Sequence, residues 1–149
     1  APVVGYHYGA ANHKEMKNVL KKSLIILSSS AVVLTAVAIL LARPISSIFV
    51  GYDAALLDMT TRAFTICATP FLVMWFNMYA SSFFTALNDG AVSAAISFMR
   101  SLILPVICIL VMPEIWHLDG VWYALAGSEI LSAVVSVGFM LAKRKKYKY

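Results

Sequence analysis

The sequence has little charge. Only 13% of its 149 residues are Asp, Glu, Lys or Arg, whereas soluble domains carry roughly 25%. Hydrophobic residues make up 61% of the chain. With so few charged side chains the chain cannot cover a water-exposed surface, so the composition excludes an ordinary soluble domain and indicates a protein whose solvent is largely lipid.

Cysteine and histidine are also scarce. Cys67 and Cys108 both lie inside apolar runs, and His7, His13 and His117 are scattered along the chain. A disulfide framework or a metal site needs clusters of these residues, and no pair of catalytic groups falls within one membrane leaflet. We therefore expect a protein that is not an enzyme, with no metal site and no organic cofactor.

Four long segments are almost free of charge, and each is 19 to 25 residues long. They are residues 24–42, 63–87, 91–112 and 121–142. A helix of about 20 residues crosses the hydrocarbon core at ~1.5 Å per residue. Within lipid only a helix satisfies its own backbone, and these segments are too long for transmembrane strands. The sequence predicts an all-α membrane protein with four transmembrane helices.

The positive charge gathers near the two ends of the chain, where two runs hold nine of the twelve Lys and Arg residues. The first run contains Lys14, Lys17, Lys21 and Lys22, and the second contains Lys143 to Lys146 with Lys148. Four crossings put both runs on one side, which the positive-inside rule identifies as the cytoplasm. Charge that brackets apolar segments does not form the basic face of a nucleic-acid-binding protein.

This pattern divides the chain into three parts. Residues 1–22 would be the end of a preceding helix followed by a cytoplasmic basic loop. Residues 23–142 would form the four-helix transmembrane bundle, with outer loops at 43–62 and 113–120, and 143–149 would be a cytoplasmic basic tail. We expect a multi-pass protein of the plasma (cell inner) membrane, with the bilayer as its main partner and no nucleic-acid partner.

Prolines and one aspartate give local signals. Pro44 and Pro113 are expected to end the first and third spans, because proline removes a backbone donor. Pro70 and Pro105 lie inside spans and predict kinks. Asp53 is a good N-cap for a short helix that extends to about Thr60 in the first outer loop.

The predicted helices carry small and polar residues at four-residue spacing, which places them on one face. The stripes are Asn77, Ser81 and Thr85; Ser93, Ser97 and Ser101; and Ala124, Ser128, Ser132 and Ser136. Such stripes allow helices to approach closely in lipid. We expect helix packing through Ser128 and Ser132. Asn77 is more costly to bury, so it either packs helices or lines a transport pathway.

Arg100 and Glu129 are the charged residues within the spans. A charge near the middle of the bilayer usually faces a cavity or a partner. Two interpretations of Glu129 remain open: it takes up a proton during transport, or it pairs with Arg100 and locks two helices together. Arg100 either pairs in this way or extends its side chain to the cytoplasmic surface.

Four motifs follow one another along the chain. They are Gly5-Tyr6-His7-Tyr8-Gly9-Ala10-Ala11-Asn12 with Lys14 and Lys17; Leu87-Asn88-Asp89-Gly90; Met99-Arg100-Ser101 with Pro105; and Gly120-Val121-Trp122-Tyr123-Ala124 with Ser128-Glu129. In order and spacing the chain resembles the multidrug and toxic compound extrusion (MATE) family. Gly5, Tyr8, Gly9 and Ala10 would belong to the family signature that closes a helix at the cytoplasmic face.

The resemblance implies an exporter of twelve helices in two bundles, which works by alternating access. It would exchange small cationic, amphipathic organic compounds for H+ or Na+ as the coupling ion. This chain would run from the end of the eighth helix to the twelfth and form most of the C-terminal bundle. Its partner would be the missing N-terminal bundle of the same protein, and Glu129, Asn77 and Arg100 would tune coupling.

Two other functions remain open. The same superfamily includes flippases of lipid-linked oligosaccharides, whose cavities carry several basic residues. The chain could also be a non-transporting four-helix membrane subunit.

Overall fold

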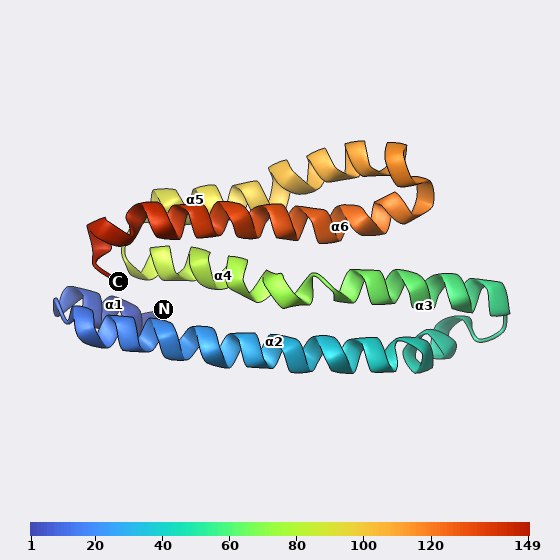
Figure 1. The fold of residues 1–149 in the computed structure, drawn as a ribbon, viewed down its shortest axis with the longest axis horizontal. Helices are drawn as coiled ribbons and strands as arrows, with labels where there is room; N and C mark the ends of the chain where they lie inside the picture. Colours follow the sequence, from blue (N-terminus) through green and yellow to red (C-terminus); the bar gives the residue numbers. More distant parts are fainter.

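The computed structural model describes all 149 residues, and nearly all of them are helical (Figure 1). The helices are α1 (Pro2–Gly9), α2 (His13–Val50), α3 (Ala54–Ala68), α4 (Phe71–Ala86), α5 (Gly90–Phe98), the π-helix η1 (Met99–Ile103) and α6 (Leu104–Tyr147). There is no strand. The prediction of an all-α fold is confirmed.

Three helical stretches are long and apolar enough to cross a membrane. They are His13–Val50, Ala54–Ala86 and Gly90–Tyr147. The third contains 58 residues, which at ~1.5 Å per residue is far longer than one crossing needs. It folds back on itself at His117, so it contributes two antiparallel arms (Figure 1).

One end of the bundle collects the basic residues, and we call it the basic end. It comprises α1, the first turns of α2, the turn at Asn88–Asp89 and the segment 143–149 (Figure 1). Both ends of the chain lie here, whereas the reversal at His117 and the α2–α3 connection lie at the opposite end (Figure 1).

Helix α2 corrects two expectations. The basic residues from Lys14 to Lys22 are helical and not a loop, because Asn12 caps α2 by accepting a hydrogen bond from the amide of Glu15 at 3.2 Å. The helix also continues through Pro44 to Val50. Proline deletes one backbone hydrogen bond, but unwinding an apolar helix would leave several backbone groups unpaired.

Helices α3 and α4 follow one another with a break at Pro70 (Figure 1). Asp53 caps α3 as predicted and accepts hydrogen bonds from the amides of Ala55 and Leu56 at 2.9 and 3.1 Å. The prediction of a short helix ending near Thr60 is wrong, since α3 runs without interruption to Ala68. No proline or glycine lies between the cap and that point to end it.

The α5–η1–α6 hairpin also differs from expectation at Pro113. This proline lies inside α6, and the chain reverses four residues later, at His117, where φ is 51° and ψ is −127°. Histidine enters this left-handed half of the map more readily than most side chains do. The two arms then meet closely, because a Cβ on Gly120 would lie 2.7 Å from Cα of Pro113 and closer still to the carbonyl of Met112.

The largest hydrophobic cluster lies at the basic end. It contains Met16 of α2, Phe83 and Phe84 of α4, and Tyr147 and Tyr149 from the end of the chain. Elsewhere long apolar side chains are exposed along α2 and α6, among them Leu34, Leu40, Val134 and Leu141. An apolar surface along the length of the bundle suits contact with lipid chains.

Replacing Gly120 with alanine should destabilise the hairpin. The added methyl group would meet backbone atoms of Met112 and Pro113, which cannot rotate away as a side chain can. Overpacking of this kind costs about 1–3 kcal/mol. The measurement is the thermal unfolding midpoint of the purified full-length protein in detergent.

Gly138→Ala is the matched control, because nothing lies within 4 Å of a Cβ at that position. Alanine favours a helix interior over glycine by roughly 1 kcal/mol, so this variant should be as stable as the parent or more so. Equal unfolding midpoints for the two variants would contradict the close approach at Gly120.

Candidate functional site

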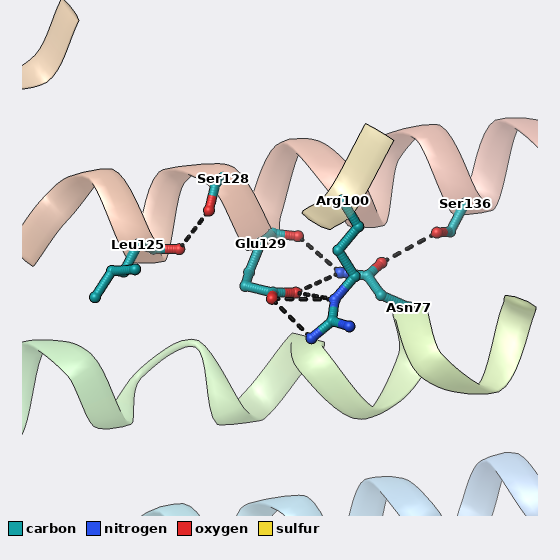
Figure 2. Close-up of polar contacts among 6 residues, drawn as sticks. All are labelled: Asn77, Arg100, Leu125, Ser128, Glu129 and Ser136. Carbon is teal, nitrogen blue, oxygen red and sulfur yellow. Dashed lines mark hydrogen bonds and ion pairs between the residues drawn. The ribbon is translucent and has the colours of Figure 1, made fainter. Parts of the chain in front are cut away.

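An ion pair between Arg100 and Glu129 lies in the middle of the bundle (Figure 2). Nε of Arg100 donates to both carboxylate oxygens of Glu129 at 3.1 Å, and Nη2 lies 3.0 Å from Oε1. The two side chains are only 21% and 13% exposed. Of the two interpretations of Glu129, the structure contains the ion pair, and the side chain of Arg100 is directed to Glu129 and does not extend to the basic end.

Asn77 also binds the carboxylate of Glu129. Its Nδ2 donates to Oε2 of Glu129 at 2.8 Å and to the backbone carbonyl of Glu129 at 3.1 Å. Its Oδ1 accepts a hydrogen bond from the hydroxyl of Ser136 at 3.1 Å. Asn77 and Ser136 are fully buried. The amide therefore has a partner on both its donor and its acceptor side (Figure 2).

Three elements position this cluster: α4 carries Asn77, η1 carries Arg100, and α6 carries Glu129 and Ser136. In η1 the amide of Leu104 donates to the carbonyl of Met99, five residues earlier. The wide turn comes directly before Pro105, whose missing N–H removes a bond that would otherwise favour α-helical spacing. Pro105 thus accompanies a π-helix at the guanidinium, a feature frequently found at functional sites.

A second polar network joins α4 to α5. The hydroxyl of Ser81 lies 2.9 Å from that of Ser93 and 2.8 Å from that of Ser97. The hydroxyl of Thr85 lies 2.7 Å from that of Ser93. Two of the predicted stripes therefore face one another and exchange hydrogen bonds.

A small polar pocket of about 180 Å³ connects the two networks. It is lined by Asn77, Met78, Ser81, Ser82, Ile96, Ser97 and Arg100. The pocket places hydroxyl groups next to the guanidinium, where a small polar ligand or water has several hydrogen-bonding partners.

The stripe on α6 faces the interior. Ala124, Ser128, Ser132 and Ser136 are all buried. The hydroxyl of Ser128 donates to the carbonyl of Leu125 on its own helix at 2.9 Å, and that of Ser132 has no partner.

The four motif residues near the start of the chain lie at the basic end. Gly5 of α1 approaches the carbonyl of Ala86 so closely that a Cβ would lie 3.2 Å away. The ring of Tyr8 meets that of Tyr147 edge to face at 5.7 Å. Gly9 ends α1 and Ala10 is its C-cap.

Sequence reasoning missed an acidic centre at the basic end. Asp89 caps α5, accepts a 2.6 Å hydrogen bond from the hydroxyl of Tyr147, and lies 3.9 Å from the ammonium groups of Lys143 and Lys146. The sequence feature that could have indicated this centre is Asp89 itself, the one acidic residue between the predicted spans 63–87 and 91–112, on the same side as the basic segment 143–149. The tyrosines of that segment gave no periodic pattern that would predict their burial.

Three pKa values at the basic end are shifted by this arrangement. The hydrogen bond from Tyr147, together with the capping amide and the two lysines, lowers the pKa of Asp89. Burial raises the pKa of Tyr147, and its hydrogen bond to Asp89 adds to the effect. Burial also raises the pKa of Tyr149 to about 12.

No three His, Cys, Asp or Glu side chains lie close enough together to hold a metal ion. Two further ion pairs lie at the end opposite the basic end. Arg62 meets Asp119 at 2.6 Å and Arg43 meets Asp58 at 3.2 Å. The first pair ties α3 to the hairpin and the second ties it to α2. Asp58 and Arg62, expected in a loop, thus belong to helix α3.

In a comparison with known protein families, one family model matches most of the chain. The MatE family model matches residues 1–110. No curated protein and no solved structure matches the chain.

Replacing Arg100 with leucine should cost more stability than replacing both members of the pair. The single variant leaves a carboxylate in an apolar setting without its cation, a penalty of roughly 3 kcal/mol for buried pairs. Arg100→Leu with Glu129→Leu removes both charges and should recover part of that loss. Thermal unfolding of the four proteins of the cycle measures the coupling. Additive effects would contradict a coupled pair.

Replacing Asp89 with asparagine should lower stability at neutral pH. Because the folded-state pKa of Asp89 lies below its ordinary value of 3.8, the ionised group stabilises the fold above that pH. The contribution is lost as the pH falls through the lower folded-state pKa. The unfolding midpoints of parent and variant should therefore differ at pH 7 and converge as the pH falls below the folded-state pKa of Asp89. A difference that does not change with pH would contradict the assignment.

Proposed function

This chain belongs to the MatE family, the MATE membrane transporters, and we propose that its full-length protein is a cation-coupled antiporter. It exports small cationic, amphipathic compounds by alternating access, with H+ or Na+ as the coupling ion. Proteins of this family are transporters and not enzymes, and the chain is a multi-pass membrane protein. The observation that carries the proposal is the single carboxylate of Glu129, held between Arg100 and Asn77.

Arg100 acts in this proposal as an internal cation. A proton, a sodium ion or a cationic substrate that reaches Glu129 competes with the guanidinium for the same two oxygens. Coupling requires that the affinity for the ion differ between the two facing states. A state in which Arg100 lies away from Glu129 binds the ion, and a state in which the pair is closed releases it.

Asn77 keeps the carboxylate in place during such an exchange. It donates both to the side chain and to the backbone carbonyl of Glu129, and it is itself fixed by Ser136. The polar pocket beside Arg100 offers the displaced guanidinium hydroxyl groups as new partners. This support makes an exchange of partners less costly than exposing a bare charge to lipid.

The charge balance favours a cationic or neutral cargo over a lipid-linked pyrophosphate. Arg100 is the only basic residue within the four apolar segments, and it is already paired with Glu129. A pyrophosphate group needs several free basic side chains. This chain has no such set of free basic side chains within its apolar segments, so it does not support the rival interpretation as a flippase.

We propose that the chain crosses the membrane four times, with the basic end in the cytoplasm. The four crossings are α2, α3 together with α4, the arm from α5 to the reversal at His117, and the arm of α6 after that reversal. The bilayer is the plasma (cell inner) membrane, and the missing N-terminal bundle of the same protein completes the cavity. A non-transporting four-helix subunit would need no intramembrane carboxylate held by both Arg100 and Asn77.

Replacing Glu129 with glutamine in the full-length protein should change the pH dependence of efflux. Glutamine keeps the hydrogen bond with Asn77 but cannot bind a proton or attract Arg100. We expect export of a fluorescent cation to fall at least about ten-fold and to depend less on external pH, because the variant lacks the carboxylate that would bind the coupling ion. Efflux is measured with the proton and sodium gradients collapsed separately.

Glu114→Gln is the matched control, because Glu114 is exposed and takes part in no ion pair. It should transport as the parent does. Normal expression of Glu129→Gln with an unchanged pH profile would return Glu129 to a purely structural ion pair.

A further inference from the structure

A groove of about 320 Å³ lies at the basic end between the start of α2 and the end of α6. It is lined by Lys17 and Leu20 of α2, by Met140, Leu141 and Arg144 of α6, and by Tyr149. Two cations therefore stand over a floor that is otherwise apolar. Neither the transport proposal nor the Glu129 cluster uses this groove.

Neither cation of the groove meets an acidic side chain. Lys17 and Arg144 take part in no ion pair with Asp or Glu. Nε of Arg144 donates to the backbone oxygen of Tyr149 at 3.2 Å, which orients the guanidinium. Two acids at the same end have other partners: Asp89 is engaged by Tyr147 and by two other lysines, and Glu15 accepts a hydrogen bond from Asn18.

The apolar part of the groove continues onto the surface that faces lipid. Leu141 is 64% exposed, and Val137, one turn earlier on the same face of α6, is also exposed. Lys17 precedes the apolar segment of α2, and Arg144 follows that of α6. The groove thus lies where the polar headgroups meet the hydrocarbon chains.

We propose that this groove binds one anionic phospholipid, with the phosphate between Lys17 and Arg144 and an acyl chain along Leu20 and Leu141. Basic pockets between transmembrane helices on the cytoplasmic side suit such headgroups, and arginine suits the planar recognition of phosphate. A free phosphate ion would use only the two cations and leave the apolar floor in contact with water. A lipid satisfies both parts of the groove.

The test is the association of spin-labelled phosphatidylglycerol with the full-length protein in phosphatidylcholine vesicles, relative to spin-labelled phosphatidylcholine. A basic residue near an anionic headgroup contributes about 1 kcal/mol, or roughly five-fold in affinity. Lys17→Gln with Arg144→Gln should therefore reduce the preference for phosphatidylglycerol at least about five-fold. Lys17→Arg with Arg144→Lys should retain most of it.

The matched control is Lys14→Gln with Lys145→Gln, which removes the same charge at the same end from residues that do not line the groove. An equal loss in both double variants would overturn the proposal in favour of general surface charge. So would complete displacement of the spin-labelled lipid by inorganic phosphate, since that would identify an anion site without a role for the acyl chain. Unfolding midpoints near that of the parent show that each variant is folded.

Discussion

A carboxylate and a guanidinium within an apolar bundle must meet, and this constraint organises the centre of the protein. The desolvation cost of each charge is too large to leave either alone, so η1 and α6 have to approach with Arg100 and Glu129 in register. Asn77 then has to lie on the facing side of α4, where it fills the remaining hydrogen-bonding positions of the carboxylate. The polar contacts that join α4, α5 and α6 follow from that registration, and the buried serines allow the close approach that it needs.

The basic end depends on a different arrangement. There the charges lie outside the apolar segments, and one acid serves several partners: Asp89 meets Tyr147, Lys143 and Lys146. Aromatic rings that are far apart in the sequence pack together at this end, with Tyr8 against Tyr147 and Phe83 against Tyr149. The segment 143–149 is therefore anchored to the hydrophobic cluster by Tyr147 and Tyr149 and is not a free tail.

How far the sequence predicts this structure depends on the range of the interaction. The apolar segments and the cap at Asp53 follow from composition and local propensity. The cost of charge in lipid indicates the pairing of Arg100 with Glu129 only as one of two interpretations. The predictions that helices end at Pro44 and Pro113 are wrong. A proline is a local signal, whereas the cost of unpaired backbone groups decides whether a helix in an apolar segment continues. The reversal at His117 brings Gly120 against Met112, a contact that no periodicity in the sequence predicts. The π-helix at η1 accompanies Pro105, but a proline by itself does not distinguish a kink from a π-helix. The burial of Tyr147 and Tyr149 likewise depends on residues far away in the sequence.

The two charge systems differ in redundancy, and the difference fits the alternating access that we propose for the full-length protein. At the basic end Asp89 has one hydroxyl and two ammonium partners, so movement of one lysine leaves the centre satisfied. In the middle, Arg100 is the only cation that reaches Glu129, so loss of that contact changes the charge state of the site. Alternating access needs a region that stays assembled and a region with two arrangements of similar free energy. Redundant contacts favour the first, and a single exchangeable partner beside a polar pocket favours the second. The π-helix carries Arg100 at the point where α5 gives way to α6, which places the proposed exchangeable partner on a turn that departs from regular α-helical spacing.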